Sequence, residues 1–177
     1  MVAEISALGR RAVAVRADIS DEDAVEQAVA GATDALGTIT LVANVAGGSG
    51  PGFGLGPLIG LPASEFRKVL DVNVTGTWLV SKACASRMLA AGVGGRICNV
   101  SSQAGKRGFP MLGAYCASKA AVNAFSEAFM QVYEPVSFLG KGAMGMVYLM
   151  RQVKLDRLVA VKVVNAEEAK KLLDSGV

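Results

Sequence analysis

The stretch Asn99-Val-Ser-Ser-Gln-Ala-Gly105, followed by Ala114-Tyr-Cys-Ala-Ser-Lys119, decides the fold of this chain and carries its most reactive side chains. The first segment ends an apolar run typical of a buried strand, and the second opens a pattern typical of a helix. Residues four apart lie on one face of a helix, so we expect Tyr115 and Lys119 to be neighbours. The positive charge of Lys119 favours the phenolate form of Tyr115. With the Ser102 hydroxyl on the same substrate oxygen, the pair predicts a proton donor for a carbonyl that receives hydride, or a base for the reverse reaction.

Strand-like and helix-like segments alternate over the first 130 residues. We predict strands at 12–17, 38–46 and 96–101, helices at 24–36, 64–91 and 114–130, and a Gly/Pro-rich loop at 47–62. Such alternation is typical of an α/β fold, in which helices cover both faces of a parallel sheet.

Bulk composition excludes several classes of function. The chain is 52% hydrophobic and 19% charged, so we expect a globular protein. Its net charge of +3 is too small, and its basic residues too scattered, to indicate a nucleic-acid partner. It has no histidine and its three cysteines lack metal-ligand spacing, so we expect no metal site. Neither a signal peptide nor a membrane helix is predicted, and a cytoplasmic location is therefore expected.

The motifs at residues 99–119 resemble those of the short-chain dehydrogenase/reductase family, and the resemblance extends over about residues 1–130. That family combines a serine with Tyr-x-x-x-Lys, matched here by Ser102, Tyr115 and Lys119. The resemblance implies that Tyr115 is the acid/base, that Ser102 orients and polarises the carbonyl, and that Lys119 tunes Tyr115 and holds the ribose. It also implies that Asn73, in Asp71-Val-Asn-Val-Thr-Gly76, supports a proton-relay water.

The same resemblance implies NAD or NADP as cofactor and a small carbonyl or alcohol as substrate. The family's Asn-Asn-Ala-Gly motif stands here as Asn44-Val-Ala-Gly47, and Asp18-Ile19 matches the pair that usually meets the adenine ring. The implied cofactor-binding residues are therefore Asp18, Ile19, Val45, Ala46 and Gly47, together with Tyr115 and Lys119.

The family's glycine-rich phosphate turn should precede Asp18, but only seventeen residues do so, and Gly9 is the single glycine among them. We therefore expect a partial Rossmann-like doubly wound sheet that lacks its first two strands and its last strand. In that sheet, residues 12–17 face a gap two strands wide before the strand at 38–46. Cofactor binding should be weak because a phosphate-cradling helix N-terminus is missing. Uncovered sheet edges favour self-association.

A second glycine-rich segment occupies the loop before residue 61. Gly54, Gly56 and Gly60 are spaced as Gly-x-Gly-x-x-x-Gly, but Pro57 interrupts them and no strand leads directly into them. Because a phosphate cradle needs a strand, a tight turn and a helix N-terminus, we predict a surface loop near the active site.

The sequence pattern changes near residue 133, which suggests one domain at 1–132 and another segment at 133–177. Glycines with the spacing Gly-x-Gly-x-x-Gly-x-Val are followed by Val-Ala-Val-Lys, and the pair resembles the opening of a protein kinase domain. The residues concerned are Gly140, Gly142, Gly145, Val147 and Lys162. A dinucleotide-binding turn would need a helix directly after the glycines, whereas residues 146–151 read as a strand.

The kinase resemblance implies an ATP site but not phosphoryl transfer. The chain contains no His-Arg-Asp catalytic loop and no Asp-Phe-Gly segment, so it offers neither a catalytic base nor a magnesium-holding aspartate. Three readings remain open: an oxidoreductase segment impaired by its missing parts, an inactive fusion or mis-joined product, and a nucleotide-binding fragment.

Overall fold

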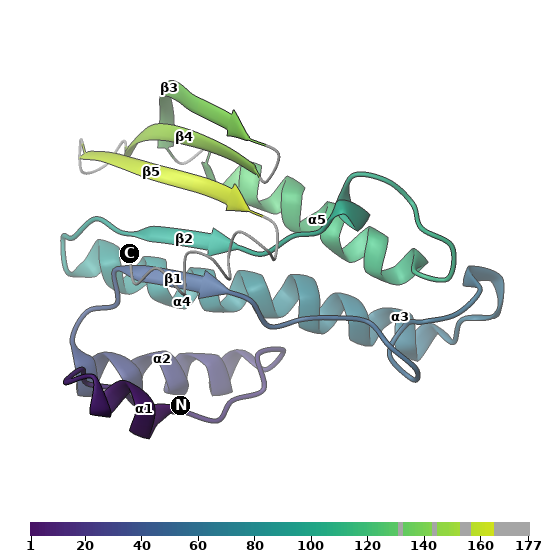
Figure 1. Cartoon of the computed structure of the whole chain (residues 1–177), viewed down its shortest axis with the longest axis horizontal. Coiled ribbons are helices and arrows are strands. Elements are labelled where there is room, and N and C mark those ends of the chain that lie inside the picture. Colours follow the sequence, from purple (N-terminus) through teal and green to yellow (C-terminus); the bar gives the residue numbers. More distant parts are fainter. Residues whose placement is uncertain (131–132, 143–144, 153–156, 165–177) are drawn as a thin grey trace.

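A computed structural model describes residues 1–130, 133–142, 145–152 and 157–164, with side chains over residues 1–128. Its helices are α1 (Val2–Ala7), α2 (Glu22–Leu36), α3 (Ala63–Leu70), α4 (Thr77–Ala90) and α5 (Gly113–Met130) (Figure 1). Its strands are β1 (Leu41–Asn44), β2 (Arg96–Asn99), β3 (Tyr133–Gly142), β4 (Gly145–Gln152) and β5 (Arg157–Val164). Short 3-10 helices span Leu58–Gly60 and Gln103–Gly105, and a π-helical turn spans Asp71–Gly76.

The centre of the α/β region is a parallel pair of strands. β1 pairs with β2 in a register that runs from Leu41 opposite Arg96 to Asn44 opposite Asn99. The connection between them is helical, and its last part, α4, packs against β1, while α2 packs against α4 (Figure 1). The predicted α/β arrangement is therefore confirmed for this strand pair and its covering helices.

An apolar cluster fixes the helices beneath β1. Val25 and Val29 are one helical turn apart on α2 and are buried against α4. The rest of the buried cluster comes from β1 and α4 and consists of Val42, Leu79, Ala83, Cys84 and Met88. The Asp21 side chain caps α2, because its Oδ1 accepts the Ala24 N–H at 3.0 Å. A capped amphipathic helix is thus held on the layer that carries β1.

A buried polar network crosses the same layer. Asn44 Nδ2 donates to Asn99 Oδ1 at 2.8 Å and to Ser81 Oγ at 2.9 Å. Asn99 Nδ2 in turn donates to Ser126 Oγ at 2.9 Å. The two asparagines are direct partners in the register of β1 and β2, so their amides join the strand pair to α4 on one side and α5 on the other.

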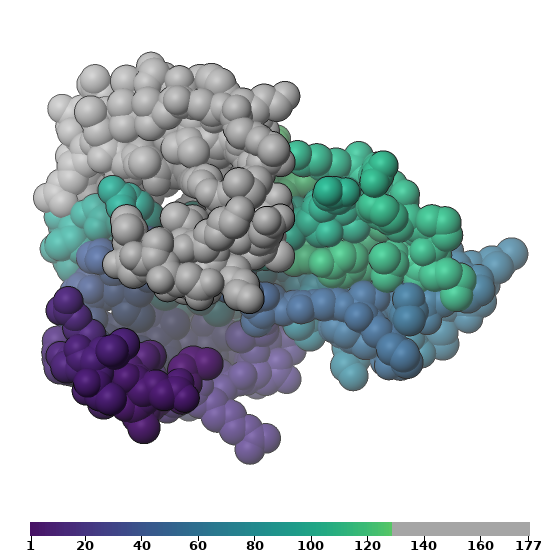
Figure 2. Space-filling model, in the orientation of Figure 1, coloured from purple at the N-terminus to yellow at the C-terminus, as the bar shows by residue number. Residues whose placement is uncertain are grey.

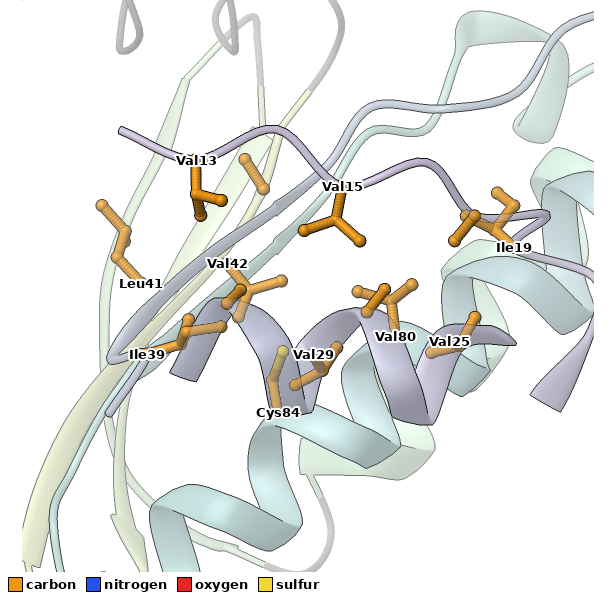
Figure 3. A pocket seen from close by; sticks show the side chains of 14 residues that line it. Val13, Val15, Ile19, Val25, Val29, Ile39, Leu41, Val42, Val80 and Cys84 are labelled. Atoms are coloured by element: carbon orange, nitrogen blue, oxygen red, sulfur yellow. The ribbon is translucent and has the colours of Figure 1, made fainter. Parts of the chain in front are cut away.

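The predicted strand at 12–17 is wrong. The segment has no strand hydrogen bonding and is instead attached to α2, since the Arg11 guanidinium donates to the carbonyls of Ala35 and Leu36, each at 3.1 Å. A groove of about 390 Å³ separates the segment from β1, and Val13 and Val15 face this space together with Leu41 (Figure 3). A β-strand needs a neighbouring strand close enough for backbone hydrogen bonds. Here apolar side chains line the space between the segment and β1, so no such bonds form. The number of strands missing from the sheet stays a prediction.

Two helical features were not predicted. The helix expected at 64–91 is divided into α3 and α4 by the π-helical turn Asp71–Gly76. The helix α1 lies at the surface, at the darkest end of the colour scale in Figure 2, and none of its residues is buried.

The carboxyl-terminal strands form their own antiparallel sheet in the order β3-β4-β5. Gly142 lies opposite Gly145, and Val147 lies between Gly140 on one neighbouring strand and Lys162 on the other. β5 lies beside β2, although the two sheets are separate among the described residues (Figure 1). After these strands the sequence also predicts a charged helix that begins at Glu167 and Glu168, but this segment falls outside the described residues, and a domain boundary near 133 stays a prediction.

Alanine substitutions at two glycines should change the free energy of unfolding in opposite directions. Gly31 is exposed within α2, and a Cβ there would meet nothing within 4 Å. Gly31→Ala should therefore raise the free energy of unfolding by about 0.5–1 kcal/mol, because alanine restricts the unfolded chain. At Gly95 a Cβ would press on Met88 Sδ and lie 2.7 Å from Thr40 O, so Gly95→Ala should lower that free energy. Urea unfolding followed by circular dichroism measures both, and equal shifts would contradict the close approach of Gly95 to Met88 on α4.

Candidate active site

The first turns of α5 carry a tyrosine and a buried lysine side by side. The side chain of Lys119 is 4% exposed, and its Nζ donates to Val100 O at 2.8 Å. The same Nζ lies 5.7 Å from the centroid of the Tyr115 ring, and Tyr115 itself is half-buried. The ammonium is thus held between a carbonyl oxygen at the end of β2 and the face of the phenol ring.

Burial has an electrostatic consequence for this lysine. Removal of the ammonium from water lowers the pKa of Lys119 below its usual value, since desolvation disfavours the charged form. A cation buried in this way stabilises negative charge nearby more strongly than an exposed one, because solvent screens it less.

Asn73 is fully buried in the π-helical turn and joins that turn to two other segments. Its Oδ1 accepts the Gly48 N–H at 2.9 Å, and its Nδ2 donates to Gly48 O at 3.0 Å. The second hydrogen of Nδ2 goes to Ser118 Oγ at 2.9 Å. Single π-turns inside α-helices are frequent at functional sites, so this turn is an indication of the region that does not depend on the motifs.

At Gly47, the loop after β1 approaches both Asn73 and Lys119. Its φ is +141°, a conformation that favours glycine. A Cβ at Gly47 would lie 2.6 Å from Asn73 Oδ1 and 3.8 Å from Lys119 Nζ. Val45, Ala46 and Gly47 are all exposed, so the backbone beside the lysine is open to a ligand.

Ser102 lies in the segment that connects β2 to α5. Its Oγ accepts the Ala104 N–H at 3.1 Å and so caps the 3-10 helix that follows. That short helix lies close against α5: a Cβ at Gly105 would lie 2.7 Å from Lys119 O, and Asn123 Nδ2 donates to Gly105 O at 3.2 Å. The serine is therefore fixed on a segment that packs on the helix of Tyr115 and Lys119.

Asp18 and Ile19 lie farther along the layer, just before α2. The Asp18 carboxylate is exposed and accepts hydrogen bonds from the Ser20 hydroxyl at 2.7 Å and the Ser20 N–H at 2.9 Å, which lower the pKa of Asp18. Ile19 packs on the end of the π-helical turn, since a Cβ at Gly76 would lie 2.7 Å from Ile19 Cδ1. The pair thus borders the turn that holds Asn73, but it is not brought into contact with Tyr115.

The kinase-like residues belong to a different part of the chain. Their glycines and lysine lie on β3, β4 and β5, in the antiparallel sheet, whereas the residues above surround the amino-terminal half of α5.

One residue that the sequence reasoning missed is Ser118, which contacts Asn73 from the helix of Tyr115. The only signal was its place three residues after Tyr115, on the same helical face.

In the part of the chain that the structure describes, no cluster of three or more histidine, cysteine or acidic side chains is arranged to hold a metal ion. No helix in that part combines the length and apolar character needed to cross a bilayer.

Known proteins are similar to this chain over its first 137 residues. A family model described as short chain dehydrogenase matches residues 1–137. The chain is 35% identical to a sorbitol dehydrogenase of Cereibacter sphaeroides over 121 residues, which cover 68% of this chain and 46% of that protein. It is 43% identical to an inactive 2-(S)-hydroxypropyl-CoM dehydrogenase 2 of Xanthobacter autotrophicus over 115 residues, or 65% of this chain and 48% of that protein.

A solved structure resembles the same region. The NAD⁺-bound xylitol dehydrogenase superposes with a TM-score of 0.68 at 33% identity, covering 73% of this chain and 48% of that chain. The chain spans about half the length of the curated relatives it matches. Because the family model covers well over half of its residues, this chain belongs to the short-chain dehydrogenase family.

Proposed function

We propose that residues 1–130 act as an NAD(P)-dependent oxidoreductase on a small alcohol or carbonyl compound, with polyols the first class to test. The observation that carries this proposal is the junction of Lys119, Tyr115 and Gly47, where a buried ammonium lies beside a phenol ring and an exposed glycine backbone. The similarity to a sorbitol dehydrogenase and to a xylitol dehydrogenase supports the polyol class.

In this proposal each residue of the site has one task. Tyr115 gives a proton to the substrate oxygen, or takes one from it, and the Ser102 hydroxyl holds that oxygen in place. Lys119 stabilises the negative charge that Tyr115 carries in one of its two states. Asn73 supports a water that returns the proton to solvent. A bound nicotinamide cofactor supplies the hydride or accepts it.

The residues fit the nicotinamide half of such a cofactor better than its phosphates. Val45, Ala46 and Gly47 present exposed backbone next to Lys119, and any side chain at Gly47 would block that surface. Asp18 and Ile19 are proposed for the adenine end. The described residues before Asp18 form the short helix α1 and an extended segment, without a strand, glycine turn and helix to cradle the phosphates. We propose NAD or NADP, bound weakly.

The assay that tests the proposed function follows NAD⁺ or NADP⁺ reduction with sorbitol, xylitol and galactitol, and the reverse reaction with the matching ketoses. Activity should appear and should fall by about 10²-fold or more in Tyr115→Phe, because the phenylalanine cannot move a proton. Tyr115 is half-buried and phenylalanine keeps its ring, so the variant should fold. Equal rates for the two proteins would contradict the role of Tyr115, and the absence of any turnover would favour an inactive chain.

Cofactor binding can be measured apart from turnover. We expect a Kd for NADH in the range of about 0.1–10 mM, since the helix N-terminus that neutralises phosphate charge is not among the described residues. Titration of NADH fluorescence measures this affinity, and Gly47→Val should weaken it further, because a side chain there would displace Asn73 and the loop after β1. A micromolar Kd would show that another part of the chain holds the phosphates.

We also propose self-association through the edge of β1 that pairs with no other described strand. One edge of β1 pairs with β2, and the other borders the apolar groove, where Leu41 is 57% exposed (Figure 3). An uncovered strand edge beside apolar side chains favours pairing with a second copy of the chain. Leu41→Glu should lower the association constant by about tenfold or more, because it places a charge in that interface.

Sedimentation velocity over a concentration series measures this association. Ile59→Glu is the matched control, since Ile59 is another exposed aliphatic residue that lies on the 3-10 helix away from the groove. Equal effects of the two changes would contradict an interface at β1.

A second candidate function rests on the antiparallel sheet. The pairing of Gly142 with Gly145 forms a hairpin, and Lys162 lies opposite Val147 on the next strand, as a glycine loop over a nucleotide requires. ATP binding without phosphoryl transfer is therefore kept as a proposal, although the family match ends at residue 137, before that loop.

A third proposal is that the chain is an inactive product. It is 43% identical to a relative that is itself described as inactive, and the region matched covers about half of that relative.

A further inference from the structure

We propose that Ser118 is a positioning residue of the active site, which fixes the orientation of the Asn73 amide and through it the Gly47–Gly48 backbone. Ser118 is fully buried on α5, between Tyr115 and Lys119 in the sequence. This inference rests on the proposed oxidoreductase function for its catalytic consequence, but its structural part stands independently.

The hydrogen bonds of Ser118 have a fixed direction. Its hydroxyl donates to Tyr115 O at 2.8 Å, so its single hydrogen is already used within α5. The oxygen can therefore act toward Asn73 only as an acceptor, and it accepts Asn73 Nδ2 at 2.9 Å. An Asn73 amide turned by 180° would place Oδ1 against Ser118 Oγ and Gly48 O, with three acceptors facing each other and no donor among them.

The orientation set by Ser118 is transmitted to the loop after β1. With Nδ2 held by Ser118, the Asn73 Oδ1 accepts the Gly48 N–H at 2.9 Å, and the other Nδ2 hydrogen reaches Gly48 O at 3.0 Å. The amide therefore holds both polar groups of Gly48. Gly47, the next residue toward β1, is the one whose Cβ position lies 3.8 Å from Lys119 Nζ. Ser118 thus sets the spacing between that loop and the buried lysine.

The chain offers a matched control on the same helix. Ser126 is 4% exposed, donates to Val122 O at 2.6 Å and accepts Asn99 Nδ2 at 2.9 Å. Its chemistry is the same as that of Ser118, but its asparagine lies on β2 rather than beside Gly48. Ser126→Ala removes an equivalent buried hydroxyl without touching the loop.

The first readout is amide hydrogen exchange by NMR, which does not depend on activity. In Ser118→Ala, exchange of the Gly48 amide should accelerate by about tenfold or more, while the amides of Val25 and Val29 in α2 stay protected as in the unchanged protein. Ser126→Ala should leave Gly48 unchanged. If the alanine variant does not fold, Ser118→Cys replaces it, because its thiol is similar in volume but a weak acceptor.

The second readout is steady-state kinetics on the polyol that the unchanged chain turns over. Ser118→Ala should lower kcat by about tenfold or more with KM changed less than about threefold, since Asn73 acts on proton transfer rather than on substrate binding. Unchanged Gly48 exchange in both Ser118 variants, or equal acceleration in Ser126→Ala, would overturn the inference. A chain without dehydrogenase activity would overturn the proposed function, and the Gly48 exchange would still decide the role of Ser118.

Discussion

A single buried amide, that of Asn73, holds together the three segments from which the site is built. It lies in a π-helical turn and forms hydrogen bonds with the N–H and the carbonyl of Gly48 after β1 and with the hydroxyl of Ser118 on α5. A fully buried amide with an unsatisfied donor is costly, so these segments are bound to one another by the requirement that its hydrogens be used. The approach of Gly47 to Lys119 follows from this arrangement, and so does the exposed backbone beside that lysine.

Sequence reasoning predicted the parts of the fold that short-range patterns determine. Periodicity predicted the helix at 24–36, which is observed as Glu22–Leu36, and the parallel strands around Val42 and Ile97. It also predicted the helical face shared by Tyr115 and Lys119. The strand predicted at 12–17 is absent. An apolar run indicates a strand buried between two other strands, but whether those strands lie beside it depends on contacts with distant parts of the chain. A period of 3.6 also cannot distinguish a continuous helix from one interrupted by a π-turn at Asn73.

The site was predictable to the same extent. Motif spacing singled out Ser102, Tyr115, Lys119 and Asn73 as candidates. The structure places Lys119 beside the Tyr115 ring, and the roles of the four residues stay predictions. Ser118 carries no such signal, since a serine in a helix is ordinary until its hydroxyl is seen to accept from Asn73. Ile19 was expected at the adenine end of the cofactor, whereas its observed contact is with Gly76, at the end of the turn that holds Asn73. Such a contact joins segments far apart in the sequence and cannot be read from spacing.

The distribution of these contacts explains how this local geometry can form in a chain that matches only about half of the length of its relatives. Every hydrogen bond that positions Asn73 and Lys119 is made by groups between Gly48 and Lys119, within one contiguous part of the chain. A phosphate cradle depends on a different strand, turn and helix, whose contacts with this part are indirect. The proposed proton-transfer residues and a phosphate cradle are therefore separable pieces of the fold. The hydrogen bonds around Asn73 and Lys119 are made without a cradle, whereas tight binding of the dinucleotide phosphates would depend on that strand, turn and helix.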